Sequence, residues 1–481
     1  MVLIISNNLK KNAISLSGAI AMSIAIMAPA AGMMFVPQVV AQSAGSSVPL
    51  VYFIALIGSL FVANTIVQFA KRITHAGSFF AYNSAGLGQT MGFLSGWLLM
   101  SGYFVFYPQN ILVASFFSSQ IITQHFGIDI HWSLFSIFFI VIIWYLSTRG
   151  ISSSMKADLY FVGAEMLIIL IVVFAIILQG GADGHTFEVM TAEGSPSGWS
   201  GIFFGMIFAM MTFMGFESVA TVAEETSDPK KNIPRAIWGS VVGMGIFYII
   251  VTYAMSIGFG SHNGDEFAKS VLAMDYLAAT YIGDWLRIAV AIAGIVSAFA
   301  ISLALNNAAV RVIYAMGREK VFPSKLGITH KKYATPVHAI NAVGILATII
   351  VLLMGFIFGP YPVGYGMLGS FATLPILLLY VLASISLIMF IRKNHRNEFS
   401  LWSHGIAPII GALVMLLPIY GSIFPFPAWP YNLVLILVLV YILVGFILGL
   451  VLKRKTQNLV QDVSKIISSD GSEKIVEKVI K

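Results

Sequence analysis

Two carboxyl groups occupy long apolar segments, where ionisable side chains are rare. Glu217 closes the segment FMGFE at 213–217, and Glu165 lies in GAEML at 163–167. A charged group in a nonpolar setting is costly, so it is usually retained for work with ions, protons or polar ligands. A neutral carboxyl that hydrogen-bonds a neighbouring helix is the plain alternative. We favour a functional role for Glu217, whereas the two interpretations are balanced for Glu165.

Helix-breaking residues interrupt two of the apolar segments near their middle. Segment 13–41 contains APAAG at 28–32, and segment 199–223 contains Gly215 within 213–217. Proline removes a backbone donor and clashes with the preceding turn. Inside a bilayer, unpaired backbone groups are tolerated only where protein covers them or where they line a cavity. A simple kink explains either interruption alone, but the two together favour a binding site at mid-membrane.

The elements that must position these residues are membrane-spanning helices. Of 481 residues, 58% are apolar and only 10% are charged, whereas about a quarter of the residues in a soluble domain are charged. About 20 apolar residues of helix cross a bilayer. The sequence therefore predicts an all-α membrane protein with twelve transmembrane helices. Their expected ranges are 13–41, 48–70, 92–122, 132–147, 157–178, 199–223, 236–258, 284–310, 337–358, 363–391, 405–424 and 431–452.

The basic residues gather on one side of the membrane in this scheme. The net charge is +7, with 27 lysines and arginines. If the N-terminus is cytoplasmic, all of them except Lys269 and Arg287 fall in cytoplasmic segments, as the positive-inside rule requires. The distribution predicts a multi-pass membrane protein with both termini in the cytoplasm. We expect its location to be the plasma membrane. Because the excess charge is explained by topology, no nucleic-acid partner is expected.

Residue types that support other chemistry are missing or scattered. The chain has no cysteine, which removes disulfides, thiolate metal sites and cysteine nucleophiles. His125 and His131 flank one predicted outer loop without the third ligand that a zinc site needs. No phosphate-binding loop is present. We therefore expect no metal, no cofactor and no enzymatic activity.

Four stretches carry recognisable motifs, in the order of the chain. They are AAG at 30–32 with Pro37; HAGSFFAY at 75–82 with GFLSGW at 92–97; FMGFE at 213–217 with AEE at 223–225, DP at 228–229 and IPRA at 233–236; and Arg311 with YAMGRE at 314–319, Pro323 and TP at 335–336. Together they resemble the amino acid–polyamine–organocation (APC) superfamily of permeases over spans one to ten. The resemblance implies a LeuT-like fold, with a 5+5 inverted repeat, broken helices one and six, and two extra C-terminal helices.

The resemblance also implies how the chain is divided. The expected units are a cytoplasmic N-terminus (1–12), a first five-helix repeat (13–178), a second five-helix repeat (199–391), helices eleven and twelve (405–452) and a cytoplasmic tail (453–481).

A member of this superfamily would act as a secondary active transporter of amino acids or related amines, working by alternating access. In the family, the span-one turn receives the substrate carboxylate and the span-six break receives its amino group. By position, the expected substrate-binding residues are Ala30, Ala31, Gly32, Met33, Tyr107, Phe213, Met214, Gly215 and Phe216. Two alanines stand where the family has a Gly-Ser pair, which weakens the expectation of carboxylate recognition. Glu217 and Glu165 are the candidates for gating or proton coupling, with H+ as the favoured coupling ion.

Several alternatives stay open at this point. A polyamine or organic-cation carrier, in which an amine pairs with Glu217, is the main rival, and an exchanger of the same fold is another. A channel would need a repeated polar lining along a pore, and a membrane-embedded enzyme would need converging nucleophile, base or metal ligands. The sequence shows neither pattern. It predicts a small-molecule substrate and a lipid bilayer as partners, and no particular oligomeric state.

Overall fold

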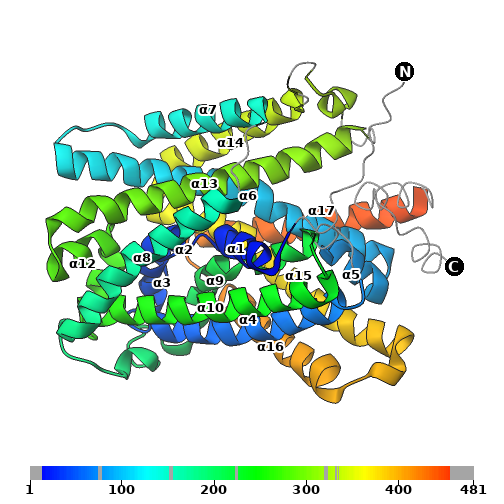
Figure 1. Ribbon diagram of the computed structural model, residues 1–481, viewed down its shortest axis with the longest axis horizontal. Coiled ribbons are helices and arrows are strands. Elements are labelled where there is room, and N and C mark those ends of the chain that lie inside the picture. Colours follow the sequence, from blue (N-terminus) through cyan, green and yellow to red (C-terminus); the bar gives the residue numbers. More distant parts are fainter. Residues whose placement is uncertain are drawn as a thin grey trace.

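The computed structural model describes residues 14–73, 78–150, 155–222, 226–318, 323–330, 333 and 335–455. Within these ranges the chain is helical and contains no strand, apart from an isolated bridge between Ile14 and Thr226. Most of the long helices run roughly along the longest axis of the molecule (Figure 1). The predicted all-α membrane fold is confirmed. The expected N-terminal unit 1–12, most of the tail, and the motif residues 75–77, 223–225 and Glu319 lie outside the described residues.

The helices follow one another along the chain with short connections. They are α1 (Leu16–Met27), α2 (Pro29–Phe35), α3 (Pro37–Ala44), α4 (Val48–Ala70), α5 (Ser78–Leu87), α6 (Gln89–Phe126), α7 (Trp132–Arg149), α8 (Met155–Gln179), η1 (Glu188–Met190), α9 (Gly198–Phe213), η2 (Phe216–Val222), α10 (Pro229–Phe259), α11 (Gly264–Lys269), α12 (Ala273–Tyr281), α13 (Asp284–Arg318), η3 (Ser324–Gly327), α14 (Val337–Phe358), η4 (Pro360–Gly364), α15 (Tyr365–Asn394), η5 (Arg396–Glu398), η6 (Leu401–Ile406), α16 (Ala407–Gly421) and α17 (Tyr431–Lys455).

Eleven segments of the described chain are long and apolar enough to cross a membrane, judged by length and composition. They coincide with eleven of the twelve predicted spans. The exception is the expected third span, 92–122, which lies in α6. This helix has 38 residues and packs against α13 and α15, but serine, glutamine and asparagine dilute its apolar residues. The twelfth crossing therefore stays a prediction.

Polar contacts and close approaches fasten the helices to one another. The Asn306 amide on α13 donates to the Ser147 hydroxyl on α7 at 2.9 Å. Elsewhere in the bundle, Trp97 Nε1 on α6 donates to the Tyr441 carbonyl on α17 at 3.0 Å. A side chain at Gly445 would collide with the Trp97 ring, so a small residue lets α17 approach closely. Such contacts stabilise helix pairs in a medium where apolar association alone gives little.

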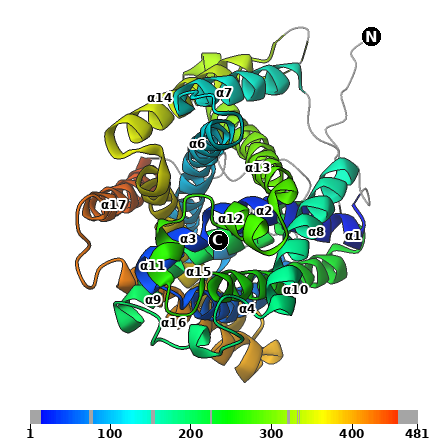
Figure 2. The same ribbon diagram turned by 90° about the vertical axis from the view of Figure 1, so that its left-hand side faces the viewer.

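The two ends of the bundle are closed by different connections. At one end, α11 and α12 lie over α2 and α3 (Figure 2). At the other, Arg72 follows α4 and reaches Glu398 in η5, with 2.9 Å between nitrogen and oxygen. The Arg72 guanidinium holds the pKa of the Glu398 carboxyl below its usual range. Connections far apart in the sequence thus tie neighbouring helices together at both ends.

Candidate functional site

The first helix of the bundle is interrupted at Ala28. This residue has left-handed backbone angles, φ 45° and ψ 67°, and separates α1 from α2. Pro29 explains the position, because a proline disfavours helical geometry in the residue before it while fitting well at the first position of a new helix. The predicted interruption of span one is confirmed. It falls just before the expected turn, and Ala30, Ala31, Gly32 and Met33 form the start of α2.

The interruption leaves backbone donors free at the start of α2. A helix start has N–H groups with no partner in its own helix. The Gly32 amide is paired, since it donates to the Ala28 carbonyl at 2.8 Å. For Ala30 and Ala31, by contrast, no amide hydrogen bond is found within the described part of the chain. Two of the three expected donors are therefore available to a ligand.

The second interruption lies between α9 and η2. Met214 is extended, with φ −60° and ψ 140°, and Gly215 has φ +112°. Only glycine adopts such a conformation readily. A Cβ atom at Gly215 would also lie 2.6 Å from Cγ2 of Ile26, which belongs to α1. The predicted break of span six is thus confirmed, and its glycine is required both by the backbone and by contact with the first broken helix.

Glu217 belongs to the second interruption. Its side chain is 9% exposed, and a carboxylate oxygen accepts a hydrogen bond from the Gly215 amide at 3.0 Å. The carboxylate also interacts electrostatically with Tyr380 on α15 and Tyr103 on α6. Glu217 therefore satisfies a backbone donor that the break exposes, so its charge is tied to the geometry of the break.

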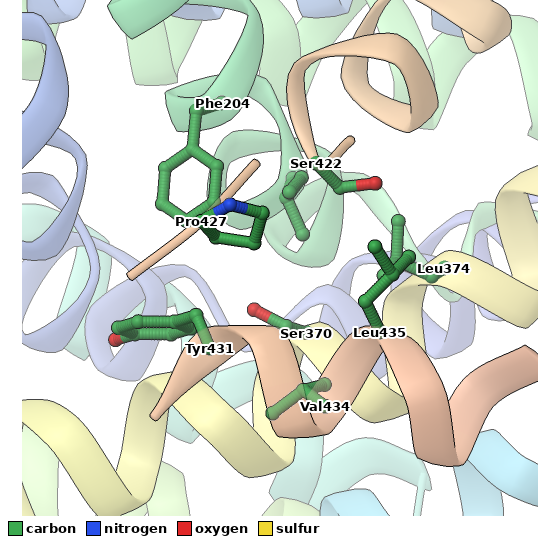
Figure 3. Close-up of a pocket in the computed structure, with 9 residues that line it drawn as sticks. Phe204, Ser370, Leu374, Ser422, Pro427, Tyr431, Val434 and Leu435 are labelled. Atoms are coloured by element: carbon green, nitrogen blue, oxygen red, sulfur yellow. The ribbon is translucent and has the colours of Figure 1, made fainter. Parts of the chain in front are cut away.

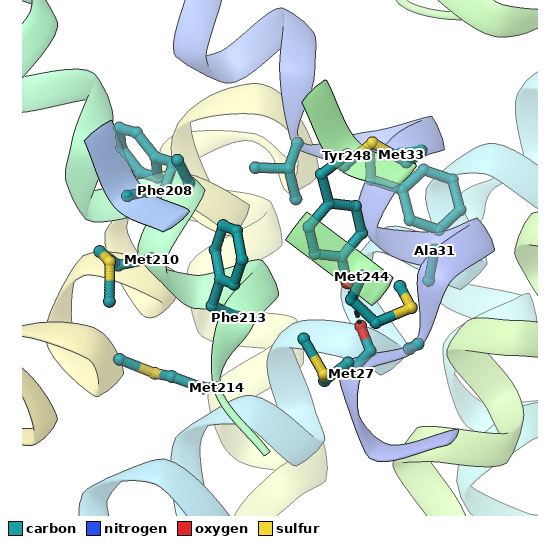
Figure 4. Packing of buried hydrophobic residues seen from close by; sticks show 14 of the residues in the cluster. Met27, Ala31, Met33, Phe208, Met210, Phe213, Met214, Met244 and Tyr248 are labelled. Atoms are coloured by element: carbon teal, nitrogen blue, oxygen red, sulfur yellow. Dashed lines mark hydrogen bonds between the residues drawn. The ribbon is translucent and has the colours of Figure 1, made fainter. Parts of the chain in front are cut away.

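The two interruptions meet at one tyrosine of α10. The Tyr248 hydroxyl lies 3.2 Å from the Met27 carbonyl at the end of α1 (Figure 4). It also lies 2.9 Å from the Thr212 carbonyl at the end of α9. A second link is formed by Ser23 on α1, whose hydroxyl donates to the Phe216 carbonyl at 3.2 Å. The carbonyl ends of both half-helices thus converge. Sequence reasoning missed Tyr248, because nothing distinguishes it from the other tyrosines in apolar segments.

Apolar side chains fill the space around the convergence. The Phe213 ring meets the Tyr248 ring edge-on, with 5.2 Å between centroids. Methionine side chains surround them, among them Met27, Met33 and Met244 (Figure 4). Phe213 and Phe216 are fully buried. Among the described residues, the interior between the breaks is therefore packed mainly with apolar side chains, and its polar groups include backbone carbonyls, the Tyr248 hydroxyl and Glu217.

A small pocket lies elsewhere in the bundle, between α9, α15 and the start of α17 (Figure 3). Its lining residues are Phe204, Ile207, Ser370, Leu374, Ser422, Pro427, Tyr431, Val434 and Leu435. None of them belongs to either interruption, so we do not associate this pocket with the predicted site.

Two predicted site residues are not joined to the convergence. Tyr107 on α6 is buried, with 1% of its surface exposed, but no hydrogen bond or ring contact within the described residues links it to either break. Glu165 lies on α8, which packs against α1, α2 and α13. Its carboxyl faces Ser297 on α13, and its Oε2 atom is buried without a hydrogen-bond partner. The roles of both residues stay predictions.

Comparison with known proteins gives a consistent picture. A family model described as "Amino acid permease" matches residues 14–461. The chain is 28% identical over 317 residues to the low-affinity putrescine importer PlaP of Escherichia coli (strain K12), covering 63% of this chain and 67% of that protein. It is 25% identical to the branched-chain amino acid permease BcaP of Bacillus subtilis (strain 168), covering 62% and 65%. It is 24% identical to the methylthioribose transporter of the same organism, covering 79% and 81%.

Proposed function

This chain belongs to the amino acid permease family, and we propose that it is a secondary active transporter that moves amino acids or related amines across the cytoplasmic membrane by alternating access. The family and the matched relatives are transporters, so the chain is not an enzyme. The observation that supports the mechanism most is the meeting of two helix interruptions at the Tyr248 hydroxyl. Interrupted helices present backbone groups that bind the charged ends of a small solute.

The proposed site takes the two ends of the substrate at two different helix ends. The free amides of Ala30 and Ala31 receive the carboxylate, since the start of a helix carries partial positive charge. The carbonyl end of α9, at Thr212 and Phe213, receives the amino group. Alanine supplies no hydroxyl, so the backbone alone binds the carboxylate. The methionine and phenylalanine side chains around the breaks favour a substrate with an apolar side chain.

The proposed architecture is a pair of inverted five-helix repeats, 13–178 and 199–391, followed by helices eleven and twelve in 405–452. What supports it is the correspondence of the interruptions. The first broken helix opens the first repeat, and α9 with η2 opens the second. Inverted repeats of this kind bring equivalent broken helices together at mid-membrane.

We propose that Glu217 couples transport to protons. Its carboxylate accepts a hydrogen bond from the Gly215 amide. A charged acceptor makes a stronger hydrogen bond than a neutral one. Protonation would therefore weaken the contact that fixes the second break and allow η2 to move. Glu165 is the second candidate, because its Oε2 atom is buried without a hydrogen-bond partner.

A carrier of polyamines or other organic cations is the second candidate function. It is supported by the acidic Glu217 at the break and by the similarity to a protein named as a putrescine importer. In that case the amine pairs with the carboxylate, and the Ala30 and Ala31 amides contribute little.

Uptake into proteoliposomes tests both functions. Labelled neutral amino acids, cationic amino acids and putrescine are offered while a proton gradient or a sodium gradient is imposed separately. We expect accumulation of an apolar amino acid when the outside is acidic, and loss of that pH dependence in Glu217→Gln. Glu165→Gln is measured beside it. The matched control is Glu193→Gln, which changes an exposed carboxyl in the loop between η1 and α9.

Three outcomes would contradict parts of the proposal. If both buried-carboxyl variants keep the wild-type pH dependence, neither residue carries the coupling proton. If putrescine alone accumulates, the amine carrier replaces the amino acid transporter. If no gradient and no counter-substrate drives accumulation, the chain is not an active carrier.

A further inference from the structure

The connection between α10 and α13, residues 260–283, folds over one end of the bundle. Within it, α11 packs against α3, while α12 packs against α13, α8 and α2; Figure 2 looks onto this end. The Val271 carbonyl between the two short helices accepts a 3.4 Å hydrogen bond from Gln38 on α3. Because α3 continues the first broken helix, this connection lies across the outer end of the proposed site. We call residues 260–283 the cover.

One buried ion pair fastens the cover to the bundle. Asp275 on α12 is 1% exposed, and its Oδ2 atom accepts from Nε of Arg287 at 2.9 Å and from Nη2 at 2.8 Å. Arg287 lies in the first turn of α13 and also reaches Asp284 at 3.1 Å. A carboxylate removed from water is unfavourable unless a partner compensates its charge. The closed position of α12 therefore depends on Arg287.

The second carboxylate oxygen of Asp275 has a possible hydrogen-bond partner nearby but no hydrogen bond. Asp275 Oδ1 is buried without a hydrogen-bond partner, and so is Nε2 of His125 in the last turn of α6. The two atoms lie 3.7 Å apart, which is too long for a hydrogen bond. A movement of about 1 Å would join them. Asp275 thus bonds Arg287 in this structure and could bond His125 after a small movement. Two alternative partners suit an element that moves.

The other contacts of the cover are neutral hydrogen bonds, one exposed ion pair and aromatic stacking. Gln179 Nε2 on α8 donates to the Tyr281 carbonyl at 2.7 Å, and the Tyr281 hydroxyl donates to the Gly258 carbonyl at 3.0 Å. His262, ahead of α11, lies 3.5 Å from Glu188 of η1.

The Phe267 ring on α11 stacks on Phe259 of α10, with 4.9 Å between centroids, and Tyr276 stacks on the same ring at 5.3 Å. Such contacts are weakly directional. Within the described residues, no charged side chain of α2, α8 or α10 forms an ion pair with the cover's helices. Asp275 and Arg287 therefore form the hydrogen-bonded ion pair that joins the cover's helices to the bundle, with the Asp275 carboxylate buried.

We propose that Asp275 and Arg287 form the latch of an outer gate, which holds the cover closed and separates when the site opens to that side of the membrane. The inference rests on the proposed function, because a gate needs a site to serve. A buried ion pair gains little net free energy over two hydrated ions. Arg287 is already 26% exposed, and Asp275 becomes hydrated when the cover lifts. The pair can therefore open and close reversibly.

Cysteine labelling measures the position of the cover directly, since the chain has no cysteine of its own. Ala278→Cys places a thiol on the buried face of α12, and Thr280→Cys places one on its exposed face. We expect Asp275→Asn to raise the rate at which a maleimide labels Ala278→Cys by about tenfold or more, because the neutral amide loses the charge-assisted hydrogen bonds through which Arg287 fastens α12. Arg287→Lys, which keeps the charge but loses the fork, gives a smaller rise. Labelling of Thr280→Cys stays unchanged.

A third reporter separates gating from local fraying. Ala19→Cys lies on α1, on the other side of the first break, at a fully buried position. If the latch controls alternating access, its loss shifts molecules toward the outward-open form, and labelling of Ala19→Cys slows. Simple loosening of α12 leaves Ala19→Cys unchanged and overturns the proposal. So does an unchanged rate at Ala278→Cys in the latch variants.

The design remains decisive if Asp275→Asn does not fold. Arg287→Lys and Arg287→Met alter the partly exposed partner, and the same three reporters are measured in them. Labelling needs no substrate, so the result is independent of the uptake experiment. If the wild-type protein shows uptake and the latch variants show unaltered labelling, only the latch hypothesis is rejected. If uptake is absent but labelling is altered in the latch variants, only the proposed transport activity is rejected.

Discussion

At the scale of single residues, Gly215 is the position in the proposed site where the backbone and the neighbouring helix most strongly require glycine. Its φ of +112° costs about 1–3 kcal/mol for a residue with a side chain. An added Cβ would also meet Ile26 on α1 at 2.6 Å. We therefore expect Gly215→Ala to lower initial uptake in proteoliposomes by at least about tenfold, the equivalent of about 1.4 kcal/mol. Uptake is measured at equal amounts of reconstituted protein.

Gly243→Ala is the matched control for this substitution. Gly243 lies on the exposed face of α10, and an added Cβ would have no atom within 4 Å. Alanine is the better helix former by about 1 kcal/mol, so Gly243→Ala should retain wild-type uptake and thermal stability. Equal uptake by the two variants would mean that the geometry at Gly215 is not needed for transport.

At the scale of elements, α10 holds the two broken helices together. Tyr248→Phe removes the hydroxyl that reaches the Met27 and Thr212 carbonyls but keeps the ring that packs on Phe213. Hydrogen bonds between membrane helices contribute about 0.6–2 kcal/mol. We expect a lower melting temperature and a reduction of uptake by a few-fold, about what such a loss predicts.

Tyr420→Phe on α16 serves as the control, since its ring is 53% exposed. Removal of that hydroxyl should change neither the melting temperature nor uptake. If Tyr248→Phe behaves in the same way as Tyr420→Phe, the convergence of α1 and α9 does not depend on this hydrogen-bonded contact.

The elements also show which features a sequence can predict. Both interruptions were predictable, because proline and glycine act on the backbone locally. The position at Ala28, ahead of the Ala30–Gly32 turn, follows from the effect of Pro29 on its preceding residue. The contact of Asn306 with Ser147 is an amide contact between two helices, a common way to join helices in a membrane. Tyr248 and Asp275 could not be identified as important residues from the sequence, because their partners are brought to them only by tertiary packing.

At the scale of the whole molecule, composition and the order of the motifs predicted the family and the all-helical fold. The orientation of the chain in the membrane is predicted only from the distribution of charged residues. Arg392, Lys393 and Arg396 surround the connection between α15 and α16, while the connection between α6 and α7, residues 127–131, contains no lysine or arginine. Positive charge is retained on the cytoplasmic side. The α15–α16 connection is therefore expected inside the cell, and the α6–α7 connection outside.

Single cysteines test this orientation without interference from native thiols. Asp129→Cys and Asn397→Cys both replace exposed residues, one in each connection. In intact cells, a membrane-impermeant maleimide should label Asp129→Cys at once and Asn397→Cys only after the membrane is permeabilised. The reversed pattern would place the α11–α12 cover on the cytoplasmic face. Asp275 and Arg287 would then close the inner gate, and the proton gradient would reach Glu217 from the opposite end of the bundle.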